Sequence, residues 1–219
     1  MLVFLSPSNQ SENVWIDGSN EEAEAVRLAD TVERILRSRG VDVMRRDELR
    51  PFNAATGQSR TEAAIAAGVD LYIPVHSNAS AKHNATGTCI FVQDQTAPGT
   101  AAVSKRYAQA LAAQIDGICG KRTRPLYTDW SLTEQRQVTA AEIPSVYLEY
   151  IFHDQPDEVV WYRAHEAEMA AAIADAIQPA RRIWTVQVGA WYNKRLAEEY
   201  LAQVRQHYPD AFLTSKEVI

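Results

Sequence analysis

The sequence predicts an α/β fold in which a mainly parallel, twisted sheet is flanked by helices, followed by a small C-terminal β-α-β segment. Two observations indicate this fold. Short apolar runs alternate along the chain with segments whose apolar residues recur at the spacing of an amphipathic helix. Hydrophobic residues make up 46% of the 219 residues and charged residues 23%, which excludes a disordered or collagen-like chain.

The first three predicted elements form one β-α-β unit. Residues 2–5 are apolar and end at a run of turn-forming residues, as a short buried strand does. We expect a helix to follow, with Ser19 as its N-cap, Glu22 completing a capping box and Gly40 ending the helix. Residues 41–44 then predict a second strand.

The same criteria predict the rest of the main domain. Further strands are expected at residues 71–75, 87–92 and 145–151, and further helices at residues 61–67, 100–115 and 156–177. Pro74 is awkward in its strand, because proline cannot donate a hydrogen bond to a neighbouring strand. Gln178 and Pro179 stop the last helix, so the main domain is expected to span residues 1–178.

Residues 183–219 repeat the pattern on a smaller scale. Residues 184–189 alternate like a strand, residues 194–207 carry a helical apolar stripe, and residues 211–213 begin another strand. Because so short a segment is small for a domain that folds alone, it needs a partner surface. We expect it to dock on the main domain, to pair with a second copy, or to form the front half of a larger module.

Charge and composition argue against several classes of protein. The chain has 28 acidic residues against 22 Lys and Arg, a formal charge of −6, and no long basic run, so we expect no nucleic-acid partner. No stretch approaches about 18 apolar residues, so we expect no membrane span. The first apolar run is too short for a signal peptide. No glycine-rich phosphate-binding motif follows a strand, which argues against a flavodoxin-like nucleotide binder.

Three ionisable residues are placed where a site is expected, beyond the carboxyl ends of parallel strands. Glu21 starts the first helix, His76 follows a strand, and Glu149 lies inside an otherwise apolar strand. Together they offer two metal ligands and a base, as a hydrolytic zinc site needs. Glu21 and His76 each have an ordinary structural explanation, whereas a carboxylate in an apolar strand is either buried and paired or functional.

The sequence resembles the zinc-dependent N-acetylmuramoyl-L-alanine amidases over about residues 1–178. Residues 69–79, which read V-D-L-Y-I-P-V-H-S-N-A, resemble the family's histidine signature, A-D-L-F-V-S-I-H-x-N-A. Three further segments agree in order and spacing: G-T-C-I-F at residues 87–91, I-P-S-V-Y-L-E-Y-I-F at residues 143–152, and N-E-E at residues 20–22. Arg60 also lies ten residues before Asp70, as the family pattern asks.

The resemblance implies a reaction and roles for particular residues. It implies that His76 and Glu21 are zinc ligands, and that Glu149 activates water and then protonates the leaving amine. Arg60 and Asn78 are expected to bind substrate. The bond cleaved would be the amide between the lactyl group of N-acetylmuramic acid and L-alanine. The substrate would be peptidoglycan, and the protein would act in the cell wall or outside the cell. The sequence leaves open the route by which the protein would be exported.

One motif departs from the family. The family's first motif is D-P-G-H-G-G, whose histidine is a further zinc ligand. This chain instead has S-P-S-N-Q at residues 6–10, which is similar to a branch of the family that includes phage and clostridial enzymes. Asn9 occupies the histidine column, but Gln10 is longer and is the predicted third ligand, with Asn9, His83 and His153 as alternatives. An amide oxygen binds zinc more weakly than imidazole. The alternative function is therefore a catalytically silent peptidoglycan-binding protein.

The C-terminal segment carries a second resemblance. Residues 186–213 resemble the front half of a SPOR domain, which binds glycan strands stripped of stem peptides. The simpler explanation is an amphipathic β-α-β extension. The sequence thus predicts peptidoglycan as the partner and a homodimer through residues 183–219.

Overall fold

The computed structural model describes residues 1–52, 58–119, 122–129, 131–180 and 193–207. The chain divides into two compact units, Met1–Ala180 and Arg181–Ile219. The first unit therefore ends two residues beyond the boundary predicted from the sequence.

The first unit contains a five-stranded sheet with the strand order β2-β1-β3-β5-β4. The strands are β1 (Leu2–Pro7), β2 (Asp42–Met44), β3 (Leu71–Asn78), β4 (Cys89–Phe91) and β5 (Tyr147–Phe152). The helices of this unit are α1 (Glu21–Ser38), α2 (Arg60–Ala67), α3 (Pro98–Cys119), α4 (Thr133–Ala140) and α5 (Pro156–Ile177). Every strand pair is parallel except β4 with β5, which confirms the predicted α/β fold with a mainly parallel sheet.

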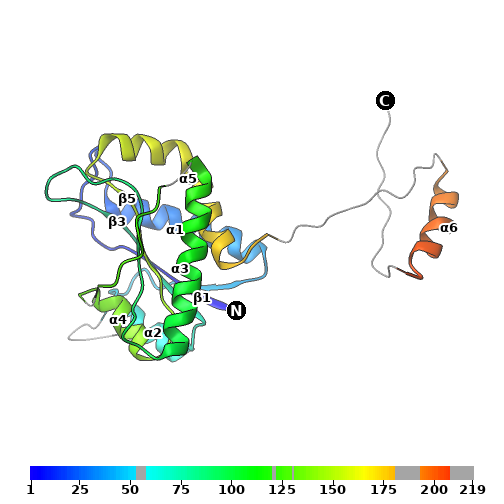
Figure 1. Ribbon diagram of the computed structural model, residues 1–219, viewed down its shortest axis with the longest axis horizontal. Coiled ribbons are helices and arrows are strands. Elements are labelled where there is room, and N and C mark those ends of the chain that lie inside the picture. Colours follow the sequence, from blue (N-terminus) through cyan, green and yellow to red (C-terminus); the bar gives the residue numbers. More distant parts are fainter. Residues whose placement is uncertain (53–57, 120–121, 130, 181–192, 208–219) are drawn as a thin grey trace. The chain divides into compact units, whose positions relative to one another are not determined.

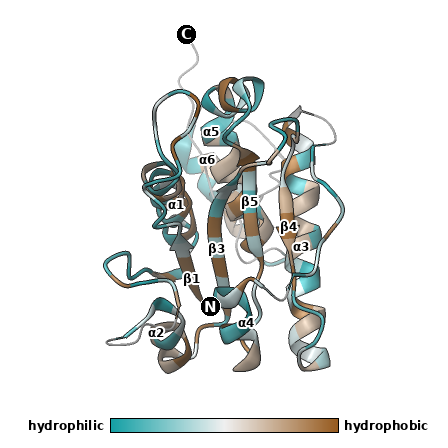
Figure 2. Cartoon of the chain, turned by 90° about the vertical axis from the view of Figure 1, so that its left-hand side faces the viewer, coloured by the Kyte–Doolittle hydropathy of each residue, from teal (hydrophilic) through white to brown (hydrophobic). Residues whose placement is uncertain are grey.

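Alternation along the strands divides the buried residues between the two faces of the sheet. Val3, Leu5 and Ile73 join the larger core cluster, which contains residues of α1, α3 and α5. Phe4 and Tyr72 point the other way and form a smaller cluster with residues of α2 and α4. These two helices lie side by side at one end of the unit (Figure 1). The apolar colouring of β1 and β3 reflects their position between the two layers (Figure 2).

The start of α1 differs from the prediction. Its N-cap is Asn20, whose side chain accepts a hydrogen bond from the backbone N–H of Ala23 at 2.9 Å. Ser19 lies one residue outside the helix, and its hydroxyl donates to the buried carboxylate of Glu24 instead. The predicted capping box of Ser19 and Glu22 is therefore wrong, because an N-cap oxygen must reach the N–H groups of the first turn.

Helix α4 was not predicted from the sequence. Its buried residues are mostly polar, since Glu134, Gln135 and Thr139 are buried beside Val138. A search for apolar periodicity misses such a helix, because the side chains that face the protein interior are held by hydrogen bonds.

The second unit is described only at residues 193–207. These contain helix α6 (Lys194–Val204), which the apolar stripe of this segment predicted. Its N-cap is Asn193. The strands expected at 184–189 and 211–213 lie outside the described residues. Within the described ranges, no helix combines the length and apolar character that crossing a membrane requires.

Candidate active site

The sheet places His76 and Glu149 next to each other. They are register partners on the adjacent strands β3 and β5. Both alternate with residues of the larger core, Val75 and Leu148, so their side chains lie on the opposite face, where α2 and α4 pack. His76 is 4% exposed and Glu149 is half-buried.

Two of the other predicted residues, Glu21 and Gln10, meet at one nitrogen of His76. Its Nδ1 lies 2.8 Å from Oε1 of Glu21, the first residue of α1, and 3.3 Å from Nε2 of Gln10. Asn13 links the other two residues, because its side-chain nitrogen donates to Gln10 Oε1 at 2.9 Å and to Glu21 Oε2 at 2.8 Å. Sequence reasoning missed Asn13, which lies in a polar stretch without a recognisable motif.

The opposite side of the imidazole faces a residue that sequence reasoning also missed. His76 Nε2 is buried, has no hydrogen-bond partner in the described part of the chain, and lies 3.8 Å from Oε2 of Glu134 on α4. Tyr147 stacks on the ring with centroids 4.7 Å apart and planes 19° apart. The imidazole is therefore enclosed by Glu21, Glu134 and Tyr147.

Burial and charge shift the pKa values of the acidic groups in opposite directions. Burial raises the pKa of Glu149 to about 8, although the charge of His76 acts against this. Burial also acts to raise the pKa of Glu21, but hydrogen bonds from His76 and Asn13 bring it below its usual value. A carboxyl group whose pKa lies near neutral pH can both accept and donate a proton during a reaction.

The surrounding carboxylates favour a positive charge at His76. Burial alone would lower the pKa of His76, but the neighbouring carboxylates of Glu134 and Glu21, together with the charge of Glu149, raise it to about 10. The position between these groups is therefore suited to a cation, either an imidazolium or a metal ion beside the ring.

The donor set fits a metal ion only if an amide is counted. The described residues contain no group of three His, Cys, Asp or Glu side chains placed to hold a metal. Glu21 and His76 are a carboxylate and an imidazole, both common zinc ligands, and their donor atoms meet at the His76 Nδ1 edge. Gln10 reaches the same edge with its amide nitrogen, so it would need a half-turn of the amide to present its oxygen. The residues present thus fit an ion with one weak ligand.

The other predicted ligands lie elsewhere. Asn9 is exposed, and the structure brings Gln10 rather than Asn9 to His76. His83 is exposed and pairs with Asp154 at 2.8 Å. His153 is buried and shares a hydrogen bond of 2.8 Å with the hydroxyl of Ser77. The geometry favours Gln10 among these alternatives.

The two predicted substrate contacts differ in their surroundings. Arg60 is 1% exposed, and its guanidinium donates to the carbonyl oxygens of Pro7, Arg46 and Asp47. It ties the end of β1 to the loop after β2, and its contact with substrate stays a prediction. Asn78 ends β3 and is half-buried, and its side-chain oxygen accepts from the N–H of Ala79 at 2.8 Å.

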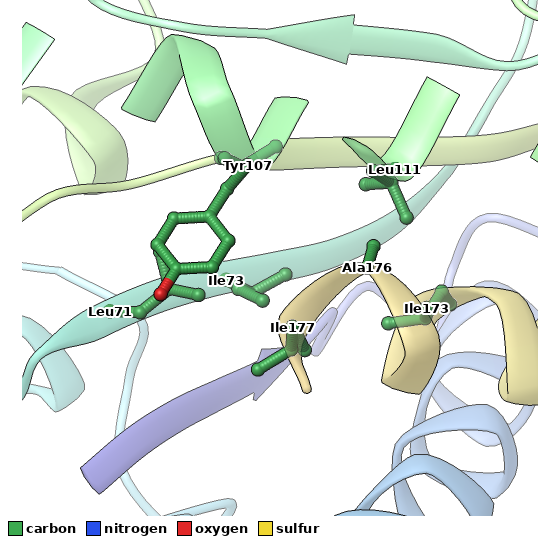
Figure 3. A pocket seen from close by; sticks show the side chains of 8 residues that line it. Leu71, Ile73, Tyr107, Leu111, Ile173, Ala176 and Ile177 are labelled. Atoms are coloured by element: carbon green, nitrogen blue, oxygen red, sulfur yellow. The ribbon is translucent and has the colours of Figure 1, made fainter. Parts of the chain in front are cut away.

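An apolar cavity elsewhere in the unit is not a second candidate. Figure 3 shows it lined by side chains of β3, α3 and α5, including Leu71, Tyr107 and Ile177. Apart from Tyr107, the lining side chains are aliphatic. It belongs to the larger core rather than to the site.

Comparisons with known proteins match the chain to one family. The sequence profile of the N-acetylmuramoyl-L-alanine amidase family matches residues 9–179. No curated protein sequence matches the chain.

Solved structures show the same fold at low sequence identity. The N-acetylmuramoyl-L-alanine amidase AmiC2 of Nostoc punctiforme is 18% identical with a TM-score of 0.65, covering 81% of this chain and 94% of that one. An N-acetylmuramoyl-L-alanine amidase from Clostridium difficile 630 is 18% identical with a TM-score of 0.64, covering 80% and 94%. The catalytic domain of the CD27L endolysin, described as targeting Clostridia difficile, is 16% identical with a TM-score of 0.56, covering 80% and 94%.

Proposed function

The chain belongs to the N-acetylmuramoyl-L-alanine amidase family, and from this premise we propose that it hydrolyses the amide bond between N-acetylmuramic acid and L-alanine in peptidoglycan. The observation that carries the proposal is the meeting of Gln10, Glu21 and His76 at one edge of an imidazole, with Glu149 on the neighbouring strand. Such a substrate places the site of action in the cell wall.

Zinc is the proposed cofactor, held by Glu21, His76 and the amide oxygen of Gln10. When bound there, zinc would polarise the amide carbonyl of the substrate and make water more acidic. Glu21 supplies negative charge, and Asn13 holds it in place by donating a hydrogen bond to its Oε2 at 2.8 Å.

Glu149 is the proposed acid and base. Its Oε2 is buried and has no hydrogen-bond partner among the described residues, so it is available to a water molecule or substrate. In its ionised form it would take a proton from the attacking water. It would then give that proton to the nitrogen of L-alanine as the amide bond breaks. Asn78, at the half-buried end of β3, is the proposed substrate contact.

The alternative function is a catalytically silent peptidoglycan-binding protein. It is favoured by one observation, that the described residues hold no group of three His, Cys, Asp or Glu side chains suited to a metal. A protein of this kind would bind cell walls without retaining zinc or releasing product.

The C-terminal segment, residues 183–219, is proposed to bind peptidoglycan or to pair with a second copy of the chain. Two observations on α6 support this. None of its residues is buried, and two large apolar side chains four positions apart, Leu196 and Tyr200, are 44% and 37% exposed. Such a stripe gains free energy when a partner covers it.

The proposal is tested with purified cell-wall sacculi and the full chain. We expect the zinc-loaded protein to release new amino groups of L-alanine without releasing new reducing sugar ends, and a chelator to stop the reaction. Elemental analysis should find one zinc per chain. Sacculus binding without zinc and without new amino groups would favour the silent protein instead.

A further inference from the structure

Glu134 is a buried carboxylate that takes no part in the proposed hydrolysis. It lies near the start of α4 and is 3% exposed. Burying an ionised carboxylate is costly unless donors surround it. A glutamate in this position therefore needs either a structural or a functional explanation.

One oxygen of Glu134 is held firmly by the sheet. Its Oε1 accepts hydrogen bonds from the hydroxyl of Tyr72, at 2.6 Å, and from the hydroxyl of Ser6. Tyr72 is itself stacked on Phe4, with ring centroids 4.9 Å apart. These contacts belong to β1 and β3, so the carboxylate has little freedom to rotate.

The other oxygen is directed at His76. Glu134 Oε2 lies 3.8 Å from His76 Nε2, and that nitrogen has no hydrogen-bond partner in the described ranges. The second ring nitrogen, Nδ1, faces Glu21 and Gln10. The two sides of the imidazole thus meet different groups, and the Glu134 side is separated from the three donors of the proposed zinc site.

We propose that Glu134 is a positioning residue that accepts the Nε2 proton of His76 and thereby presents the Nδ1 lone pair to the ion. This inference rests on the zinc site of the proposed function. A neutral histidine carries its proton on one nitrogen only, and a hydrogen bond to that nitrogen decides which one is free. Carboxylates beside ligating histidines act in this way in many metal sites.

The present separation is that of an ion pair rather than a hydrogen bond. Catalytic hydrogen bonds are often long or poorly aligned before a ligand binds and tighten in the complex. We expect a shorter contact between Glu134 and His76 Nε2 once the Nδ1 side binds an ion.

A purely structural role for Glu134 makes a different prediction. Its bonds to Ser6 and Tyr72 connect α4 to β1 and β3, so the residue stabilises the fold in either case. A structural role affects melting temperature alone. A positioning role also affects zinc affinity in protein that remains folded.

The first experiment compares zinc affinity in the full chain by competition with a chromophoric chelator. Glu134→Gln keeps the shape of the side chain and removes its charge, and should weaken zinc binding about 10–100-fold. The matched control is Glu158→Gln, because Glu158 is also a buried glutamate but bonds to Arg122 and the N–H of Gly87. The control should keep wild-type zinc affinity. Unchanged affinity in folded Glu134→Gln overturns the proposal.

The second experiment needs no variant and therefore does not depend on whether Glu134→Gln folds. In zinc-loaded wild-type protein labelled with ¹⁵N-histidine, His76 should carry its proton on Nε2 and none on Nδ1. A proton on Nδ1 overturns the proposal, as does a wild-type chain that binds no zinc. Neither measurement uses turnover, so loss of the proposed hydrolytic function alone would show as bound zinc with the predicted tautomer and no product.

Discussion

Glu149 of β5 lies between His76 of β3 and Cys89 of β4 in one row of the sheet, as the register partner of both. The row places a carboxyl group beside an imidazole without any contribution from a flexible loop. Strands fix side-chain positions more closely than loops do, which suits the proton-transfer role proposed for Glu149. The raised pKa of Glu149, about 8, follows from this enclosed position.

We expect Glu149→Gln to abolish hydrolysis and to leave zinc binding intact. General acid and base catalysis contributes roughly 10²–10⁴-fold to a rate, and the amide of glutamine can accept no proton at neutral pH. Release of L-alanine amino groups from sacculi measures the loss, with Glu168→Gln on the exposed part of α5 as the charge-matched control. More than about a tenth of wild-type activity in Glu149→Gln would exclude this role.

Substitutions in the first motif test the third ligand. Gln10→His should raise zinc affinity, because imidazole is a better zinc ligand than an amide oxygen and Gln10 already lies 3.3 Å from His76 Nδ1. Asn9→His should have little effect, because Asn9 is exposed. Isothermal titration with zinc measures both. If Asn9→His strengthens binding and Gln10→Ala does not weaken it, position 9 holds the ligand.

The residues that the sequence predicted differ in kind from those it missed. Apolar runs predicted β1, β3 and β5, so the sequence alone assigned His76 and Glu149 to the edge of the sheet where the carboxyl ends of the parallel strands lie. Asn13 and Glu134 contact the same imidazole network but belong to a polar loop and a polar helix. Their importance depends on packing between distant segments, which no local pattern encodes.

Arg60 also makes contacts that its position in the motif did not predict. Its position in the family pattern predicts a substrate contact, and the structure adds that its guanidinium donates to backbone carbonyls of two segments inside the fold. A motif match gives a residue type at a position, and the contacts that this residue makes inside the protein are seen only in the folded chain.

Arg163 should stabilise the loop that carries Asn13. Its guanidinium donates to Asp17 at 2.7 Å and pairs with Glu24, a buried glutamate of α1. It also lies over the ring of Trp15, 5.0 Å from the ring centroid. Arg163→Met keeps the apolar stem and removes the charge, and should cost about 1–3 kcal/mol of unfolding free energy by leaving buried Glu24 short of a donor.

This loss should depend on pH in a defined direction. Burial acts to raise the pKa of Asp17, but the hydrogen bond and charge of Arg163 hold it below its usual value of 3.8. The stabilisation from Asp17 is therefore present above pH 3.8 and is lost as the pH falls through the lower folded value. Urea titrations of the wild type and of Arg163→Met should give a smaller difference in unfolding free energy at the acidic end of the pH range. An equal difference at every pH would contradict the pairing.

The C-terminal unit should help the enzyme to hold its substrate rather than to cleave it. All the proposed site residues lie within Met1–Ala180, and the described part of the second unit supplies none of them. A chain that ends at Ala180 should therefore cleave soluble muropeptides as the full chain does. It should bind whole sacculi less well, as a sedimentation assay would show, because the exposed stripe of Leu196 and Tyr200 is absent.

The matched variant for this truncation is the full chain with Leu196→Ser and Tyr200→Ser, which removes the stripe and keeps the length. If the stripe is the binding surface, the double variant should lose sacculus binding as the truncated chain does. Light scattering tests the second possibility, that two copies of the segment pair: the full chain should then be a dimer and the truncated chain a monomer. Undiminished sacculus binding after truncation would exclude wall binding by this unit. Equal oligomeric states would exclude its role in dimerisation.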